Sequence, residues 1–224
     1  MRGVLWLGVL CATTMGCSVL EGAEPDAEDV VGRTYVVDFA AEEVEINHAV
    51  WVLQQTMDVY GVLLQPDLDG EDFVFAIGMG ERLEGEGALL QMPCLRGTDW
   101  GSLTFDAPTV TSEEGDSLPF LYRYEGDQYE FTLLEATIGG TFAEDGSGLE
   151  DVAIDAWFDV SEVDPYVEGE ACDLLPVLGL ECGACPGQGE TCIKASIEAT
   201  VVPERTDMAF DPGYDPLADS ACAG

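Results

Sequence analysis

The sequence predicts a mostly β protein: a single antiparallel β-barrel or sandwich with few short helices, stabilised by disulfides. Apolar and polar residues alternate with a period of two through the second half of the chain, as half-buried antiparallel strands require. Glycine-rich turns separate the short strand-forming runs, and six of the eight cysteines lie beyond Cys17. We expect a closed or nearly closed barrel, because closure removes exposed strand edges.

The first half of the chain contains four runs with the composition of strands. These runs are 34–39, 59–64, 73–77 and 103–105. The segment 44–57 fits two patterns and stays ambiguous. Leu53 and Met57 belong to an apolar set with helical spacing, whereas Val44 and Ile46 belong to one that alternates as in a strand.

A hairpin with an aromatic face is predicted around the turn Glu125–Gln128. With a four-residue loop, the cross-strand pairs are Tyr124 with Tyr129, Tyr122 with Phe131, and Phe120 with Leu133. The simplest role of this aromatic row is to form the core. In an open and roomy barrel, the row would instead line an apolar ligand cavity, with Tyr122, Tyr124, Tyr129 and Phe131 as the candidate residues.

Two further strands are predicted at 152–160 and 193–201 from their strict alternation. Asp155, Trp157 and Asp159 would share the outer face of the first of them. An aromatic ring flanked by carboxylates is a candidate sugar-binding platform, with a partly covered surface tryptophan as the alternative. The two carboxylates do not fit a glycosidase, because residues four apart on a strand are about 13 Å apart.

Six cysteines are candidates for three disulfides: Cys94, Cys172, Cys182, Cys185, Cys192 and Cys222. If a strained bond within the Cys182-x-x-Cys185 pair is avoided, two local connectivities remain. These are Cys172–Cys185 with Cys182–Cys192, or Cys172–Cys182 with Cys185–Cys192, and each leaves Cys94 to pair with Cys222. A zinc site and a thioredoxin-like redox motif are the alternatives.

The first seventeen residues combine Arg2, an apolar run from Val4 to Ala12, and Gly16-Cys17. This pattern resembles the signal of bacterial lipoproteins, in which the cysteine after the cleavage point is lipidated. The resemblance implies a signal peptide at 1–16 and a lipid anchor on Cys17. It also implies a bacterial cell-envelope location, and Ser18 favours the outer membrane. Cleavage without lipidation, giving a simple secreted protein, is the alternative.

The remaining chain divides into three parts. Residues 17–32 form an acidic tether, 33–205 a β-rich domain, and 206–224 an extended or turn-rich tail with two Asp-Pro pairs. Cys222 near the end of this tail predicts that the tail is pinned to the domain.

The chain is strongly acidic, with 45 acidic residues against 7 basic ones and a net charge of −38. Such a charge repels nucleic acids, so no nucleic-acid partner is expected. The acidic run 67–72 fails as an EF-hand loop, since Gln65 and Ala76 fall at the first and last ligand positions. We expect no cofactor, with a calcium site of another kind as the alternative.

No residue is predicted to be catalytic, because His48 is the only histidine and no G-x-S-x-G motif occurs. We therefore expect a non-catalytic envelope lipoprotein that acts as a surface interaction or structural module. Its candidate partners are an envelope protein, a polysaccharide or an apolar ligand. The first alternative is a lipocalin-like carrier of an apolar small molecule, and the second is a CxxC thiol-disulfide enzyme.

Overall fold

The computed structural model describes residues 24–82, 89–112, 115–124, 127–166, 169–187 and 189–223. The predicted signal peptide and Cys17 lie outside these residues. Twelve strands are present: β1 Tyr35–Asp38, β2 Val44–Ile46, β3 Gly61–Asp69, β4 Asp72–Arg82, β5 Leu89–Gln91, β6 Leu95–Arg96, β7 Thr98–Asp106, β8 Thr109–Ser112, β9 Asp116–Tyr124, β10 Asp127–Phe142, β11 Gly148–Asp159 and β12 Cys192–Pro203. The helices are short: α1 Ala27–Val30, α2 His48–Met57 and α3 Ala171–Leu174, with 3-10 helices η1 Val160–Tyr166, η2 Leu175–Leu178 and η3 Ser220–Cys222.

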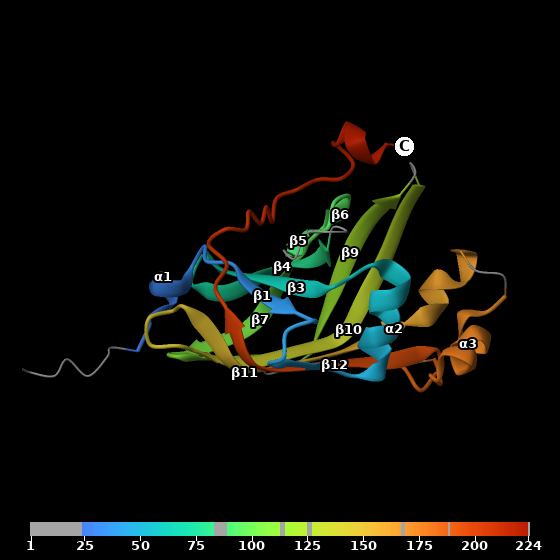
Figure 1. Cartoon of the computed structure of the whole chain (residues 1–224), viewed down its shortest axis with the longest axis horizontal. Helices are drawn as coiled ribbons and strands as arrows, with labels where there is room; N and C mark the ends of the chain where they lie inside the picture. The colour runs from blue at the N-terminus through green and yellow to red at the C-terminus, as the bar shows by residue number, and fades with distance from the viewer. Residues whose placement is uncertain are drawn as a thin grey trace, which may run out of the picture.

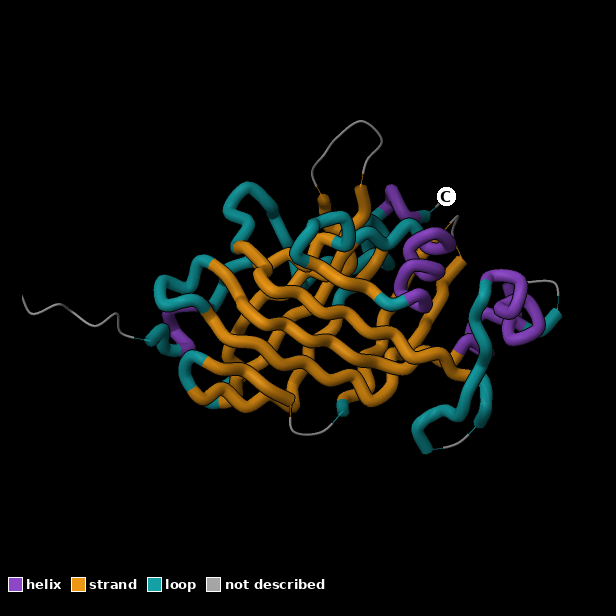
Figure 2. The backbone as a smooth tube through the Cα atoms, turned by 60° about the horizontal axis from the view of Figure 1, so that its bottom comes forward, coloured by secondary structure: helices purple, strands orange, loops and turns teal. Residues whose placement is uncertain are grey.

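All twelve strands belong to one antiparallel sheet in the order β1-β3-β4-β7-β8-β10-β11-β12-β2. β5 is added to β4, β9 to β10, and β6 to β9. The sheet curls so that β1, β3 and β4 form a layer that faces β10, β11 and β12 (Figure 1). In Figure 2 the strands of one layer cross in front of those of the other. The prediction of an antiparallel, disulfide-stabilised β fold is thus confirmed in its sandwich form.

The expected closure into a barrel is wrong. The strand path ends at β1 and β2, and in the described part of the chain these two strands do not pair. β1 reaches the other layer only just beyond β12, where Tyr35 bridges Glu204 and the Arg205 amide donates to the Thr34 carbonyl at 2.8 Å. β2 is only three residues long, and the chain then enters α2 instead of continuing as a strand.

The ambiguous segment 44–57 contains both predicted elements in succession, since β2 is followed directly by α2. Asn47 separates them by capping the helix: its side chain accepts from the Val50 amide at 3.0 Å. The side-chain Nδ2 of Asn47 donates to the Lys194 carbonyl at 2.8 Å, which fixes the start of α2 against β12. A side-chain cap of this kind satisfies a backbone donor that the first helical turn leaves unpaired.

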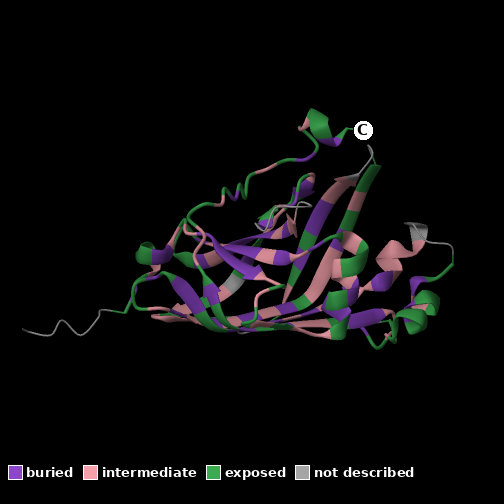
Figure 3. Ribbon diagram, viewed as in Figure 1, coloured by how far each residue is buried: buried purple, intermediate pink, exposed green. Residues whose placement is uncertain are grey.

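The core lies between the two layers and is rich in aromatic side chains. Its largest fully buried residues are Trp100, Tyr35, Phe75, Phe120 and Phe142. A second, smaller cluster covers the outer face of β1, β3 and β4, where Phe210 of the tail packs near Gly78. Figure 3 shows buried residues along the strands of both layers, while the tail is mostly exposed.

The predicted aromatic hairpin forms with a different register. Tyr122 pairs with Tyr129 and Phe120 with Phe131, so each predicted pair is displaced by two residues. The loop is therefore two residues shorter than predicted. Because the side-chain period of a strand is also two, this displacement leaves every side chain on its predicted face. The Phe120 and Phe131 rings stack with centroids 5.3 Å apart.

Candidate functional site

A cleft opens at the end of the sandwich where the β9–β10 hairpin extends beyond β11. Its volume is about 410 Å³, which falls within the ~300–1,000 Å³ typical of small-molecule sites. The lining residues come from α2, the segment before β6, the hairpin, the end of β11, and η1. They are Thr56, Met57, Asp58, Met92, Leu95, Tyr122, Tyr129, Glu130, Phe131, Phe158, Glu162 and Val163.

The inner wall of the cleft is aromatic. The Tyr122 and Tyr129 rings lie 6.2 Å apart, and the Phe131 ring meets Phe158 edge to face at 6.1 Å. Alternation along β10 places Tyr129 and Phe131 on the face that points into the sandwich. Leu95 on β6 pairs with Tyr122 and continues this apolar surface. The wall is therefore the core-facing side of the β9–β10 hairpin, which extends beyond the end of its neighbouring strand β11.

The rim is acidic, and Glu162 is its most enclosed carboxylate. Its Oε2 accepts from the Thr132 amide at 2.9 Å. β11 pairs with β10 only as far as the Leu133–Phe158 pair, so at Thr132 the side chain replaces a strand partner. Burial raises the pKa of Glu162, and the nearby charge of Asp159 raises it further, although the Thr132 hydrogen bond opposes the rise.

Asp58 forms the opposite side of the rim, at the point where α2 ends. Its φ of 54° is in the left-handed region, and this conformation terminates the helix. Thr56, the penultimate residue of α2, donates its hydroxyl to the Val52 carbonyl at 2.9 Å. The Thr56 hydrogen bond and the left-handed conformation of Asp58 therefore fix the end of α2 that lines the cleft.

Three of the four predicted cavity residues line this cleft: Tyr122, Tyr129 and Phe131. The backbone of Tyr124 pairs with Asp127, and its side chain lies outside the described part. The acidic rim, in particular Glu162, was not among the predicted site residues. No local signal in the sequence marks Glu162, because Asp159 and Asp164 lie close to it in the same segment.

The two carboxylates of the candidate sugar platform bind neighbouring side chains and backbone. Asp155 accepts a hydrogen bond from Ser196 and forms an ion pair with Lys194 at 3.0 Å, and Trp157 is half-buried. Asp159 accepts from the Ser161 amide at 3.0 Å and hydroxyl at 2.7 Å. Asp155 therefore links β11 to β12, and Asp159 fixes the start of η1.

The three disulfides select one of the two predicted connectivities. Cys94 is bonded to Cys222, Cys172 to Cys182, and Cys185 to Cys192. Cys182 and Cys185 are each joined to another cysteine and not to one another, which weakens the hypothesis of a CxxC redox enzyme. The zinc alternative loses its ligands in the same way, since a disulfide sulfur is not a thiolate.

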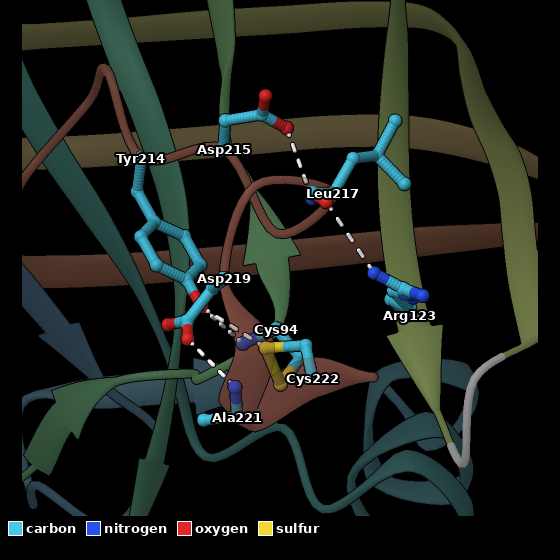
Figure 4. Close-up of a disulfide and its surroundings, with 8 residues drawn as sticks. All are labelled: Cys94, Arg123, Tyr214, Asp215, Leu217, Asp219, Ala221 and Cys222. Carbon is cyan, nitrogen blue, oxygen red and sulfur yellow. Dashed lines mark hydrogen bonds between the residues drawn. A yellow bond between two sulfur atoms is a disulfide. The ribbon is translucent and has the colours of Figure 1, made fainter. Parts of the chain in front are cut away.

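The Cys94–Cys222 disulfide attaches the tail to the segment that leads into β6 (Figure 4). Because Cys94 directly precedes the lining residue Leu95, the attachment lies next to the cleft. The Tyr214 hydroxyl lies between the two chain segments. It accepts from the Cys94 amide at 3.4 Å and donates to Asp219 at 3.0 Å. The expected attachment of the tail through Cys222 is confirmed.

The described residues contain one group of three close metal-ligand atoms, from Asp159, Cys185 and Cys192. Both of its sulfurs belong to a disulfide, so the group does not form a metal site. The acidic run 67–72 forms the exposed β3–β4 turn, in which Gly70 has a φ of 71°. His48 is structural: its Nε2 lies 2.7 Å from the Leu178 carbonyl oxygen, to which it donates.

No family model matches the chain, and no curated protein or solved structure matches it. Within the described residues, no helix is long and apolar enough to cross a membrane.

Proposed function

We propose that this protein is a non-catalytic binding protein that holds a small apolar molecule in the cleft between α2, β10 and η1. The observation that carries this proposal is the aromatic wall of the cleft. Tyr122, Tyr129 and Phe131 pack against other aromatic rings on one side and also line an open volume of about 410 Å³. Apolar surface left open in a concave site favours a ligand that covers it.

The cell envelope is the proposed location, with Cys17 as the lipidated residue and the outer membrane as the membrane that holds it. The support is the signal-like sequence ending at Gly16-Cys17, together with three disulfides in the domain. Disulfides of this kind persist in oxidising compartments outside the cytoplasm. The acidic segment 17–32 would then hold the binding domain away from the membrane surface.

A surface interaction module for an envelope protein or polysaccharide is the second candidate. The observation that favours it is a set of exposed apolar side chains on α2 and the α3–η2 segment, of which Val177 is 86% exposed. The other members are Trp51, Leu174 and Leu178. The bond between His48 and the Leu178 carbonyl joins these two elements.

Binding of the neutral dye Nile red to the full-length chain tests the cleft proposal. Thr56→Trp places a large side chain at the mouth and is expected to weaken dye binding by about tenfold or more. Gln55→Trp is the matched control, because Gln55 is also exposed on α2 but does not line the cleft. Equal weakening by both variants, or no binding by the parent chain, would overturn the proposal and favour the interaction module.

A further inference from the structure

The charges around the cleft are of one sign. The rim contains Asp58, Glu130 and Glu162, and no lysine, arginine or histidine occurs among the described residues that line the cleft. Alternation along β10 places the Glu130 side chain on the opposite face from Tyr129 and Phe131, where Gln128 donates to it at 2.7 Å. Asp58 and Glu162 are therefore the carboxylates best placed to meet a ligand.

The positive charges of the domain lie elsewhere and are mostly paired. Four of them form ion pairs: Arg33 with Glu204, Arg82 with Asp38, Lys194 with Asp155, and Arg205 with Asp207. Arg123 donates to the Leu217 carbonyl at 3.4 Å, and alternation along β9 places its side chain on the opposite face from Tyr122. Arg96 follows Leu95 on β6 and so points to the opposite face of the sheet. A carboxylate or phosphate in the cleft would meet negative charge without a compensating cation.

Glu162 has an oxygen available for a ligand. Its Oε2 is held by the Thr132 amide, while Oε1 has no hydrogen-bond partner among the described residues. A half-buried carboxylate is partly stripped of water, so a charged donor stabilises it more than a neutral donor does. Among the common charged donors, a primary ammonium is small enough to sit at the mouth while its hydrocarbon part lies on the aromatic wall.

We infer that the cleft selects apolar molecules that carry a protonated amine, with Glu162 as the residue that binds the ammonium group. The hydrocarbon part of such a ligand lies against Tyr122, Tyr129 and Phe131, and Asp58 adds to the negative potential at the mouth. This inference rests on the proposed function, because it assigns a ligand class to the same cleft.

Displacement of Nile red by three ligands of equal chain length tests the inference. Decylamine, decanol and decanoate share a ten-carbon chain and at neutral pH carry a positive, a neutral and a negative polar group, respectively. We expect decylamine to bind about tenfold more tightly than decanol, and decanoate to bind most weakly. Glu162→Gln should remove most of the amine preference, measured as the ratio of the decylamine affinity to the decanol affinity of the same variant. Glu150→Gln is the control, because it removes the same charge from an exposed position on β11.

The outcomes separate the inference from the proposal on which it rests. Nile red binding with equal affinities for decylamine and decanol would overturn the amine inference and leave the apolar cleft intact. An equal loss of amine preference in Glu162→Gln and Glu150→Gln would also overturn it, because the net charge of the protein would then explain the preference. Failure of the parent chain to bind Nile red would overturn the proposed function itself.

Discussion

The two ends of the sandwich are built from the same sheet but finish it differently. At one end, the chain beyond β12 bridges β1, and the Tyr35 hydroxyl donates to the Gly146 carbonyl at 2.7 Å. Phe142 fills the interior there, with its ring 5.4 Å from Tyr35 and 5.9 Å from Phe105. This end is closed by backbone contacts and packed aromatic rings.

At the other end, the β9–β10 hairpin continues after β11 has stopped at Asp159 and given way to η1. The hairpin keeps its aromatic inner face, but no strand in the described part of the chain lies opposite to cover it, and α2 ends at Met57 with Asp58 as its C-cap. The cleft therefore results from the unequal ends of β10 and β11 and requires no special sequence motif. An aromatic residue should therefore stabilise the fold at the closed end and serve binding at the open end.

The largest expected effect comes from truncating one aromatic residue at each end. Phe142→Ala removes a side chain that is 2% exposed, and we expect it to lower the free energy of unfolding by about 3–5 kcal/mol. Tyr129→Ala removes a half-buried side chain, and we expect a cost of only about 1 kcal/mol together with a clear loss of Nile red binding. Urea unfolding and dye titration measure the two effects, and similar unfolding costs at the two ends would contradict the comparison.

The disulfide beside the cleft gives the next effect. Cys94 and Cys222 are 128 residues apart in sequence, whereas Cys185 and Cys192 are 7 apart. Replacing the first pair with serines frees the larger loop, and we expect a cost of about 2–4 kcal/mol. Replacing Cys185 and Cys192 should cost less, because a short loop loses less entropy on closure. Urea unfolding of both double variants measures the order, and a reversed order would show that strain or packing outweighs loop length.

A smaller effect is expected from the hydrogen bond at the closed end. Tyr35 is fully buried, and burial raises the pKa of its hydroxyl well above the usual range. Tyr35→Phe removes the bond to Gly146, and we expect a cost of about 1 kcal/mol. Tyr60→Phe is the control, since the Tyr60 hydroxyl has no hydrogen-bond partner among the described residues. Thermal unfolding measures the two Tm values. An equal decrease in Tm in both variants would argue against a role for this bond in closing the sheet.

The sequence predicts the local elements well and their closure poorly. Alternation located the strands 152–160 and 193–201, because a strand with one wet face needs that pattern whatever its neighbours are. The hairpin register was wrong by two residues, since alternation specifies the face of each side chain but not its partner. Disulfide spacing left two connectivities, and three-dimensional proximity decided between them.

The acidic rim was also not predicted from the sequence, and the physical reason is different. Glu162 matters because Thr132 pairs with Pro119 of β9 but has no described strand partner on the β11 side, which depends on where β11 ends relative to β10. In a chain with 45 acidic residues, no local pattern distinguishes this glutamate from the others. The aromatic wall was predicted because four aromatic residues on one hairpin face are a visible pattern, whereas their exposure at an open end is a property of the whole sheet.

The smallest expected effect concerns the pH dependence of Glu162. Its pKa is raised in the folded chain, mainly by burial and further by the charge of Asp159. The other titratable groups that line the same cleft are Asp58, Tyr122, Tyr129 and Glu130. A carboxyl group with a raised folded pKa binds protons more readily when folded, so its ionisation destabilises the fold as the pH rises through that pKa.

Glu162→Gln retains an oxygen that can accept from Thr132 but removes this ionisation. We therefore expect the variant to have a slightly higher Tm than the parent chain at neutral pH, with the difference vanishing in acid below the ordinary carboxyl pKa. In the same acidic range, the parent chain should lose its preference for decylamine over decanol, because a protonated Glu162 no longer attracts an ammonium group. A preference that persists unchanged below the ordinary carboxyl pKa would mean that no carboxylate of the rim binds the amine.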